Sequence, residues 1–254
     1  MKEWYTNMHS KTVGMHGKIP AQGDFVSRDL PLQFTTGWDQ WMQQCLLASQ
    51  HTLGTQWLDA YLASPVWRFA MTAGVLGDQT WAGVMIPSVD RSGRYYPLML
   101  ASACGVALPT QIMAQAGPWF SELEQTALGA LDAGVTLPMV EAQLSQLPAM
   151  ALKPVPSSQE KPVHGSWEIG RPLALPLQQA QQNPLNAYPV LLHELLQQRL
   201  SCYSLWWSSG SSRLAPAQLI AGYLPSAQCY TSFLAGDWNA NGWSTPFSEV
   251  EQWF

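Results

Sequence analysis

Charged side chains are scarce in this sequence. Lysine, arginine, aspartate and glutamate together make up 11% of its 254 residues, and the formal net charge is −5. Average globular proteins carry about 25% charged residues, so polarity here is supplied largely by glutamine, serine and threonine. A protein that binds nucleic acid needs a basic surface that neutralises phosphates. The composition therefore argues against nucleic acid as a partner.

Long apolar runs and clustered cysteines are also missing. No stretch reaches the roughly 18 to 20 consecutive apolar residues that cross a membrane, and residues 1–12 lack the apolar segment of a secretory signal. We therefore expect a cytoplasmic protein with a flexible N-terminus over 1–12 and no membrane insertion. The cysteines lie far apart and form no metal-binding or disulfide pattern, which predicts four buried thiols: Cys45, Cys104, Cys202 and Cys229.

Apolar residues recur at helical spacing in several segments. Between 31 and 50 they fall three or four positions apart, which places them on one face of a helix: Phe34, Trp38, Trp41, Met42, Cys45 and Leu46. Gly54 interrupts this helix. Further helices are predicted over 55–64, 109–131, 138–147 and 184–200, with a short one within 225–235.

Strand signals are densest between residues 65 and 105. Apolar segments bounded by glycine turns predict strands over 66–72, 80–87 and 94–103, and the short connections favour antiparallel pairing. The segments WAGVMI and YYPLML are apolar on both faces, so helices must cover the sheet on both sides. Other strands are predicted over 13–19, 164–170, 202–209 and 217–224.

The predicted fold is therefore an α/β (α+β) protein with three layers, an α/β/α sandwich around a mostly antiparallel sheet. Residues 148–165 carry four prolines and are interpreted as an exposed internal loop. The elements that follow this loop complete the first half, so we expect a single domain over 13–254.

The stretch GKIPAQGDFVSRDLP, residues 17–31, begins like a phosphate-binding loop. Such a loop needs Ser or Thr after the lysine to bind magnesium, and Ile19 stands there. Lys18 is therefore interpreted as a solvated strand end. In HELLQ, residues 193–197, Gln197 occupies the place of the second zinc ligand, so His193 and Glu194 are assigned to the polar side or cap of a helix. We expect no metal and no cofactor.

Five charged residues remain candidates for a functional site: Asp24, Arg68, Asp90, Arg91 and Arg94. Arg68 lies in the apolar strand VWRFAM, where an unpaired guanidinium is costly, so it needs either a carboxylate, such as Asp90 or Asp24, or a water-filled edge. Three interpretations stay open. The charges can pin turns onto the sheet, Arg91 and Arg94 can offer forked donors to a partner's carboxylate or phosphate, or the aspartates can take part in catalysis.

Three neighbouring residues complete this set of motif positions. Gly23 is predicted to supply the bend that leads towards the Trp-rich helix, and Phe25 to plug the core. Trp67 precedes Arg68 in the same strand and is assigned a structural or partner-binding role, since tryptophans fill cores more often than they mark binding surfaces.

Four blocks of the sequence together resemble the TagF (ImpM) family of bacterial type VI secretion systems. They are GKIPAQGDFVSRDLP followed by WDQWM, WLDAYLASPVWRFAM, GVLGDQTWAGVMIPSVDRSGRYYPL, and a shorter GDW at 236–238. The first three cover residues 14 to about 104 and are specific as an ordered set.

The resemblance implies a longin- or profilin-like sandwich with an antiparallel sheet of about five strands between helices. It also implies a cytoplasmic accessory protein, not an enzyme, that represses type VI secretion after translation by contacting the forkhead-associated scaffold protein Fha. Two alternatives stay open. One is a hydrolase or phosphate-ester enzyme that uses Asp24, Asp90 and the nearby arginines, and the other is a structural subunit of the secretion apparatus.

Overall fold

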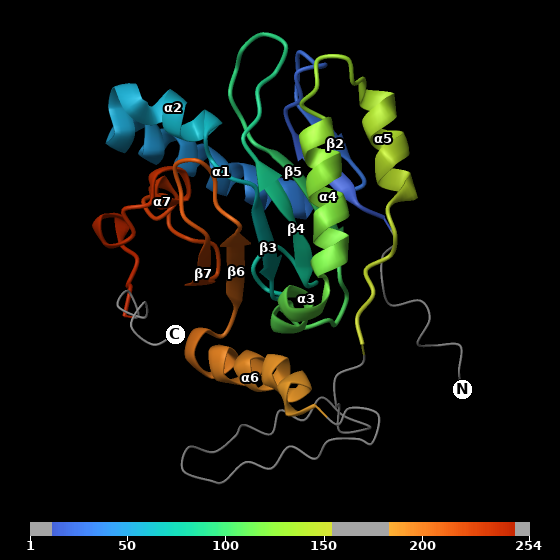
Figure 1. Cartoon of the computed structure of the whole chain (residues 1–254), viewed down its shortest axis with the longest axis vertical. Coiled ribbons are helices and arrows are strands. Elements are labelled where there is room, and N and C mark those ends of the chain that lie inside the picture. The colour runs from blue at the N-terminus through green and yellow to red at the C-terminus, as the bar shows by residue number, and fades with distance from the viewer. Residues whose placement is uncertain (1–11, 154–182, 247–254) are drawn as a thin grey trace.

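The middle layer of the fold is one antiparallel sheet. A computed structural model describes residues 12–153 and 183–246, and within them seven strands follow the order β2-β1-β5-β4-β3-β6-β7 (Figure 1). The strands are β1 (Gly14–Gly17), β2 (Val26–Arg28), β3 (Trp67–Met71), β4 (Trp81–Ile86), β5 (Leu98–Ala103), β6 (Tyr203–Ser208) and β7 (Ala217–Gly222). The α+β class is confirmed, whereas the expected number of about five strands is too low.

Helices cover both faces of this sheet (Figure 1). One face packs against α1 (Leu32–Leu53), α2 (Trp57–Leu62) and α7 (Thr231–Ala235), and the other against α3 (Pro109–Gln115), α4 (Gly117–Gly129) and α5 (Leu137–Gln146). The helix α6 (Tyr188–Leu200) packs against α3. Short 3₁₀ turns lie at Gly54–Gln56, Pro184–Ala187 and Asn239–Asn241.

Strand alternation divides the core into two parts, one on each face. In β3, Trp67 and Phe69 join the cluster that α1 forms with the sheet, whereas Ala70 belongs to the cluster under α4. Trp67 is fully buried, and its indole N–H donates to the Phe233 carbonyl at 3.1 Å. The central strands are apolar on both sides because both sides are covered.

Two predicted elements have different bounds in the structure. The helix expected over 109–131 is two helices, because Pro118 has no N–H to continue the hydrogen bonds of α3, and it lies instead in the first turn of α4, where no such bond is needed. The strand expected over 94–103 starts only at Leu98. Arg94 closes the preceding turn, and Pro97 cannot donate a hydrogen bond to the ladder.

Some predictions lie outside the described residues or hold only in part. The strand predicted over 164–170, most of the loop predicted over 148–165 and the N-terminus up to residue 11 lie outside them. Cys45 and Cys104 are buried as predicted, whereas Cys202 and Cys229 are half-buried, and all four are free thiols. In the described part of the chain, no helix combines the length and the apolar character needed to cross a membrane.

Candidate functional site

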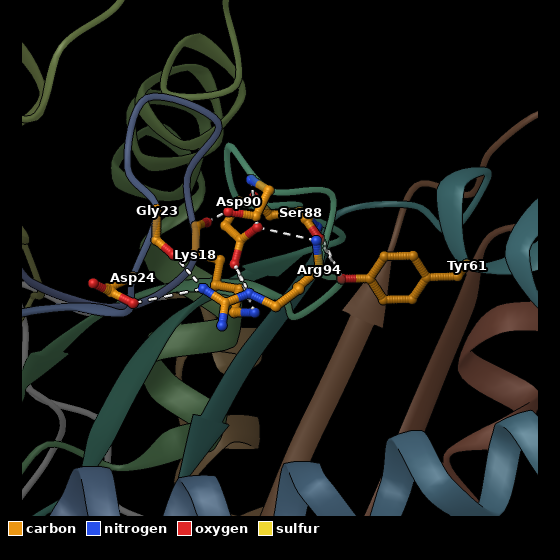
Figure 2. A network of polar contacts seen from close by, with 8 residues as sticks. Lys18, Gly23, Asp24, Tyr61, Ser88, Asp90 and Arg94 are labelled. Atoms are coloured by element: carbon orange, nitrogen blue, oxygen red, sulfur yellow. Dashed lines mark hydrogen bonds and ion pairs between the residues drawn. The ribbon is translucent and has the colours of Figure 1, made fainter.

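The carboxylate of Asp90 organises the turn between β4 and β5. Its Oδ1 accepts the backbone N–H groups of Ser92 and Arg94 at 2.8 and 3.0 Å. Its Oδ2 accepts the Arg94 guanidinium at 2.7 Å and lies 2.9 Å from the Lys18 ammonium at the end of β1. Figure 2 shows these groups converging on one carboxylate, so the turn and β1 are tied together by a single buried anion.

This environment keeps Asp90 ionised. Burial by itself raises the pKa of a carboxyl, but the hydrogen bonds from Arg94, Lys18 and Ser92 outweigh it and hold the pKa of Asp90 well below its usual range. Both oxygens are already occupied by donors. Asp90 is therefore a charged anchor at neutral pH and is poorly suited to take up a proton as a general base.

Lys18 is buried, so its interpretation as a solvated strand end is wrong. Its side chain is 7% exposed and ends at Asp90, while its backbone carbonyl accepts the Ser88 hydroxyl at 2.7 Å. Ser88 also exchanges hydrogen bonds with the Tyr61 hydroxyl of α2. The end of β1 is thus joined to the turn between β4 and β5 and, through Ser88, to α2. These contacts come from segments far apart in the sequence, so the burial of Lys18 could not be predicted from its neighbours.

A second polar cluster lies beside the first, around His16 of β1. The His16 ring Nε2 lies 2.8 Å from Asp39 of α1, and the Tyr96 hydroxyl donates to the same carboxylate. Burial raises the pKa of Asp39, but the contacts with His16 and Tyr96 outweigh this effect and lower it overall. The buried Nδ1 of His16 has no hydrogen-bond partner among the described residues.

The ring of Phe25 lies over both clusters. It stacks on His16 at 5.9 Å and meets Tyr96 edge-on at 4.7 Å, and the Lys18 ammonium lies 5.1 Å from its centroid. Phe25 is nevertheless 49% exposed, so its prediction as a core plug is wrong. The inner face of the ring covers buried polar groups, which leaves its outer face in solvent.

Two arginine side chains lie beside Gly23 and Asp24, the residues that precede Phe25. The Arg94 guanidinium donates to the Gly23 carbonyl and lies 3.5 Å from Asp24, whose side chain is 99% exposed. The backbone N–H of Arg91 donates to Gln22 at 2.9 Å, but its exposed guanidinium makes no ion pair or hydrogen bond with any described residue. We call Asp24, Phe25, Arg91 and Arg94 the Phe25 surface.

Arg68 takes no part in this site, and its predicted partner is wrong. Its guanidinium binds both oxygens of Glu124 on α4, at 2.7 and 2.8 Å, and stacks on Phe120 with 5.5 Å to the ring centroid. Neither Asp24 nor Asp90 reaches it, because Arg68 points to the α4 face, as Ala70 does. Of the five charged residues, only four come together.

His193 also differs from its prediction. It is buried, and its Nδ1 lies 2.6 Å from the Tyr203 hydroxyl, so it belongs to the contact between α6 and the sheet. Glu194 lies next to it on α6 and is half-buried. Among the described residues, no group of three or more His, Cys, Asp or Glu side chains is placed to hold a metal ion.

The buried His193 predicts a pH effect on stability. Burial lowers the pKa of His193 below its ordinary value of about 6.5, so the unfolded chain binds this proton more readily than the folded chain. Its contribution to stability is complete above about pH 6.5 and is lost as the pH falls through the lower folded pKa. The free energy of unfolding in urea should fall less between pH 7.5 and pH 5.5 in His193→Asn than in wild type. Equal drops would contradict the prediction.

Sequence reasoning missed His16, Asp39 and Tyr96. They come from β1, α1 and the loop before β5, so no spacing connects them. The one available signal is the pair His16 and Lys18, two polar residues two positions apart in a strand predicted to lie in the sheet. Residues two positions apart in a strand point to the same face of the sheet, and both side chains are buried in the structure.

Comparison with known proteins now identifies the family. The model of the TagF N-terminal domain, described as type VI secretion system-associated, matches residues 14–147, which is more than half of the chain. This chain belongs to the TagF family. The TagF match starts at β1 and ends with α5, and it contains the whole Phe25 surface. The protein is thus associated with type VI secretion.

A solved structure extends the similarity beyond the TagF N-terminal match. This chain is similar to PA0076 from Pseudomonas aeruginosa PAO1, for which a crystal structure is known. The two sequences are 33% identical, the match covers 93% of this chain and 98% of PA0076, and the TM-score is 0.75. No protein with a curated description matches this chain. Because the match covers nearly the whole chain, β6 and β7, which lie beyond residue 147, belong to the fold shared with PA0076.

Proposed function

We propose that this TagF protein represses type VI secretion after translation, by binding the forkhead-associated scaffold protein Fha and so holding assembly off. The proposal is supported by the family match over 14–147, which associates the chain with type VI secretion. The repression through Fha is what the TagF resemblance implies. It places the protein in the cytoplasm, where the scaffold would be met. It requires contact between folded surfaces and no chemical step.

The Phe25 surface is the structural observation that carries this proposal. Phe and Arg are both enriched at protein interfaces, and Arg is among the residues that contribute most to binding. Phe25 is held in one orientation by His16, Lys18 and Tyr96, so little conformational freedom is lost when a partner covers its outer face. The Arg91 guanidinium, which has no polar partner among the described residues, offers paired donors to a carboxylate or phosphate.

The same geometry gives no support to a hydrolase. The side chain of Asp24 is 99% exposed and that of Asp90 is fully buried, so the two carboxylates do not face a shared cavity. Asp90 is saturated with donors, and Arg94 is bound to Asp90 and to Gly23. A non-enzymatic role is the function that fits these positions.

The charge reversal Arg91→Glu tests the proposed function. The substitution should leave the fold intact, because the Arg91 side chain makes no described polar contact, but it should weaken Fha binding by about tenfold or more. A deletion strain complemented with this variant should secrete at the level of the deletion strain. Pull-down of Fha and a secretion assay measure the two effects.

A matched control is Arg213→Glu, which also reverses an exposed arginine. Its guanidinium lies 3.7 Å from the exposed Asp59, outside the Phe25 surface, and this variant should repress like wild type. Secretion that is unchanged by both deletion and overexpression of the protein would exclude the repressor role. Full repression by Arg91→Glu would exclude the Phe25 surface as the contact.

A further inference from the structure

The strand β7 forms one edge of the described sheet. Among residues 12–153 and 183–246 it pairs with β6 alone, in an unbroken antiparallel register from Tyr203↔Gly222 to Ser208↔Ala217. Its six residues, AQLIAG, contain no proline and no charged side chain. An edge strand carries a row of backbone groups that can pair with another strand.

The hydrogen bonds of β6 show which residues of β7 point outwards. Thr72 donates to the Tyr203 carbonyl at 3.0 Å, so Tyr203 and every second residue after it bond to β3. Tyr223 donates to Cys202 at 3.0 Å, so the alternate residues of β6 bond to β7. In an antiparallel ladder the direction of the backbone groups alternates along each strand. Ala217, Leu219 and Ala221 therefore bond to β6, and Gln218, Ile220 and Gly222 direct their N–H and C=O groups away from the sheet.

Within its six residues β7 carries no lysine, proline or bulge, although Pro216 directly precedes it. Native edge strands are protected by lysine, proline, bulges or short length. In β7 the register is regular, and Ile220 at its centre is 39% exposed. The nearest charged residues along the chain are Arg213 and Asp237, so the strand and both its flanks are uncharged.

We propose that β7 is a dimerisation strand, which pairs antiparallel with β7 of a second copy of this chain around a two-fold axis at Ile220. The outward groups are symmetric about Ile220, so Ile220 meets its own counterpart and Gln218 meets the counterpart of Gly222. This pairing joins the two sheets into one.

The absence of charge favours a second copy over an unrelated strand. Around a two-fold axis a charged residue at the centre would meet its own like charge, which destabilises a cross-strand pair. The strand can pair with its own copy in direction and register, and it carries no charge that would repel that copy. The exposed Ile220 side chains would shield each other from water on one face of the joined sheets.

The mass of the purified full chain in solution tests this proposal. Sedimentation analysis over a range of concentrations should give twice the mass of one chain for wild type. Ile220→Lys places two ammonium groups on the axis and should weaken association by about tenfold or more. Leu47→Lys is the matched control, because Leu47 is a 68% exposed apolar residue that belongs to α1 and not to β7, and this variant should remain dimeric.

Mixing two variants tests the register directly. Ile220→Lys and Ile220→Glu should each be monomeric alone and should associate when mixed, because opposite charges then meet across the axis. Circular dichroism and unfolding curves establish that each variant is folded. The proposal is overturned if wild type is monomeric at every concentration, if Ile220→Lys associates like wild type, or if the mixture stays monomeric.

Discussion

Lys18→Ala should lower the free energy of unfolding by about 3 kcal/mol. The Lys18 ammonium lies 2.9 Å from Asp90, and the two side chains are 7% and 0% exposed. Removing one partner of a buried ion pair is strongly destabilising, since the remaining charge keeps its desolvation cost. The Arg94 guanidinium still contacts Asp90, which limits the loss. Urea unfolding followed by tryptophan fluorescence measures it.

Two further variants separate charge from packing and burial. Lys18→Met keeps an unbranched side chain under Phe25 but removes the charge, so it should lose most of what Lys18→Ala loses. Arg28→Ala breaks a pair with Glu141 whose side chains are 47% and 39% exposed, and it should cost less than about 1 kcal/mol. The account of Lys18 fails if Lys18→Met is as stable as wild type, or if Lys18→Ala costs no more than Arg28→Ala.

Arg68→Ala should lower the free energy of unfolding by about 2 kcal/mol or more. Arg68 and Glu124 are joined by two hydrogen bonds, and their side chains are 18% and 24% exposed. The substitution leaves the Glu124 carboxylate without its cation and removes the guanidinium from the face of Phe120. The midpoint of urea unfolding should therefore fall, and a midpoint equal to that of wild type would refute the prediction.

A double substitution distinguishes the ion pair from the space that it fills. Arg68→Met with Glu124→Leu replaces both charges by apolar groups of similar size, which often restores or raises stability. We expect this variant to be more stable than Arg68→Ala. If the double variant is less stable than Arg68→Ala, the hydrogen bonds of the ion pair contribute more to stability than apolar packing can replace. A double-mutant cycle with the single variants Arg68→Met and Glu124→Leu measures the coupling energy between the two side chains.

The secondary structure was largely predictable, because its signals are local. The helix predicted over 31–50 is α1, and its apolar spacing reflects the single face that it buries. Gly54 ends it with a φ of 52°, a conformation that glycine adopts at little cost. The strand β2 was missed because three residues are too few to show alternation.

The candidate site was predictable only as a set of residues. Asp24, Asp90, Arg91 and Arg94 were singled out as charges near turns, and they do come together. Phe25 was assigned to the core because hydrophobicity alone does not reveal that buried polar groups would occupy the space beneath the ring.

The sequence by itself determined the apolar strands, the covering helices and the ordered blocks by which the TagF resemblance is identified. These signals are carried by neighbouring residues. Only the tertiary structure decided which charges pair. Arg68 and Glu124 are 56 positions apart, and His16 and Asp39 are 23 apart, so no local pattern connects them. Such pairs are selected by the face to which each strand residue points and by the helix that packs there, because a buried charge must find a partner within a few ångströms.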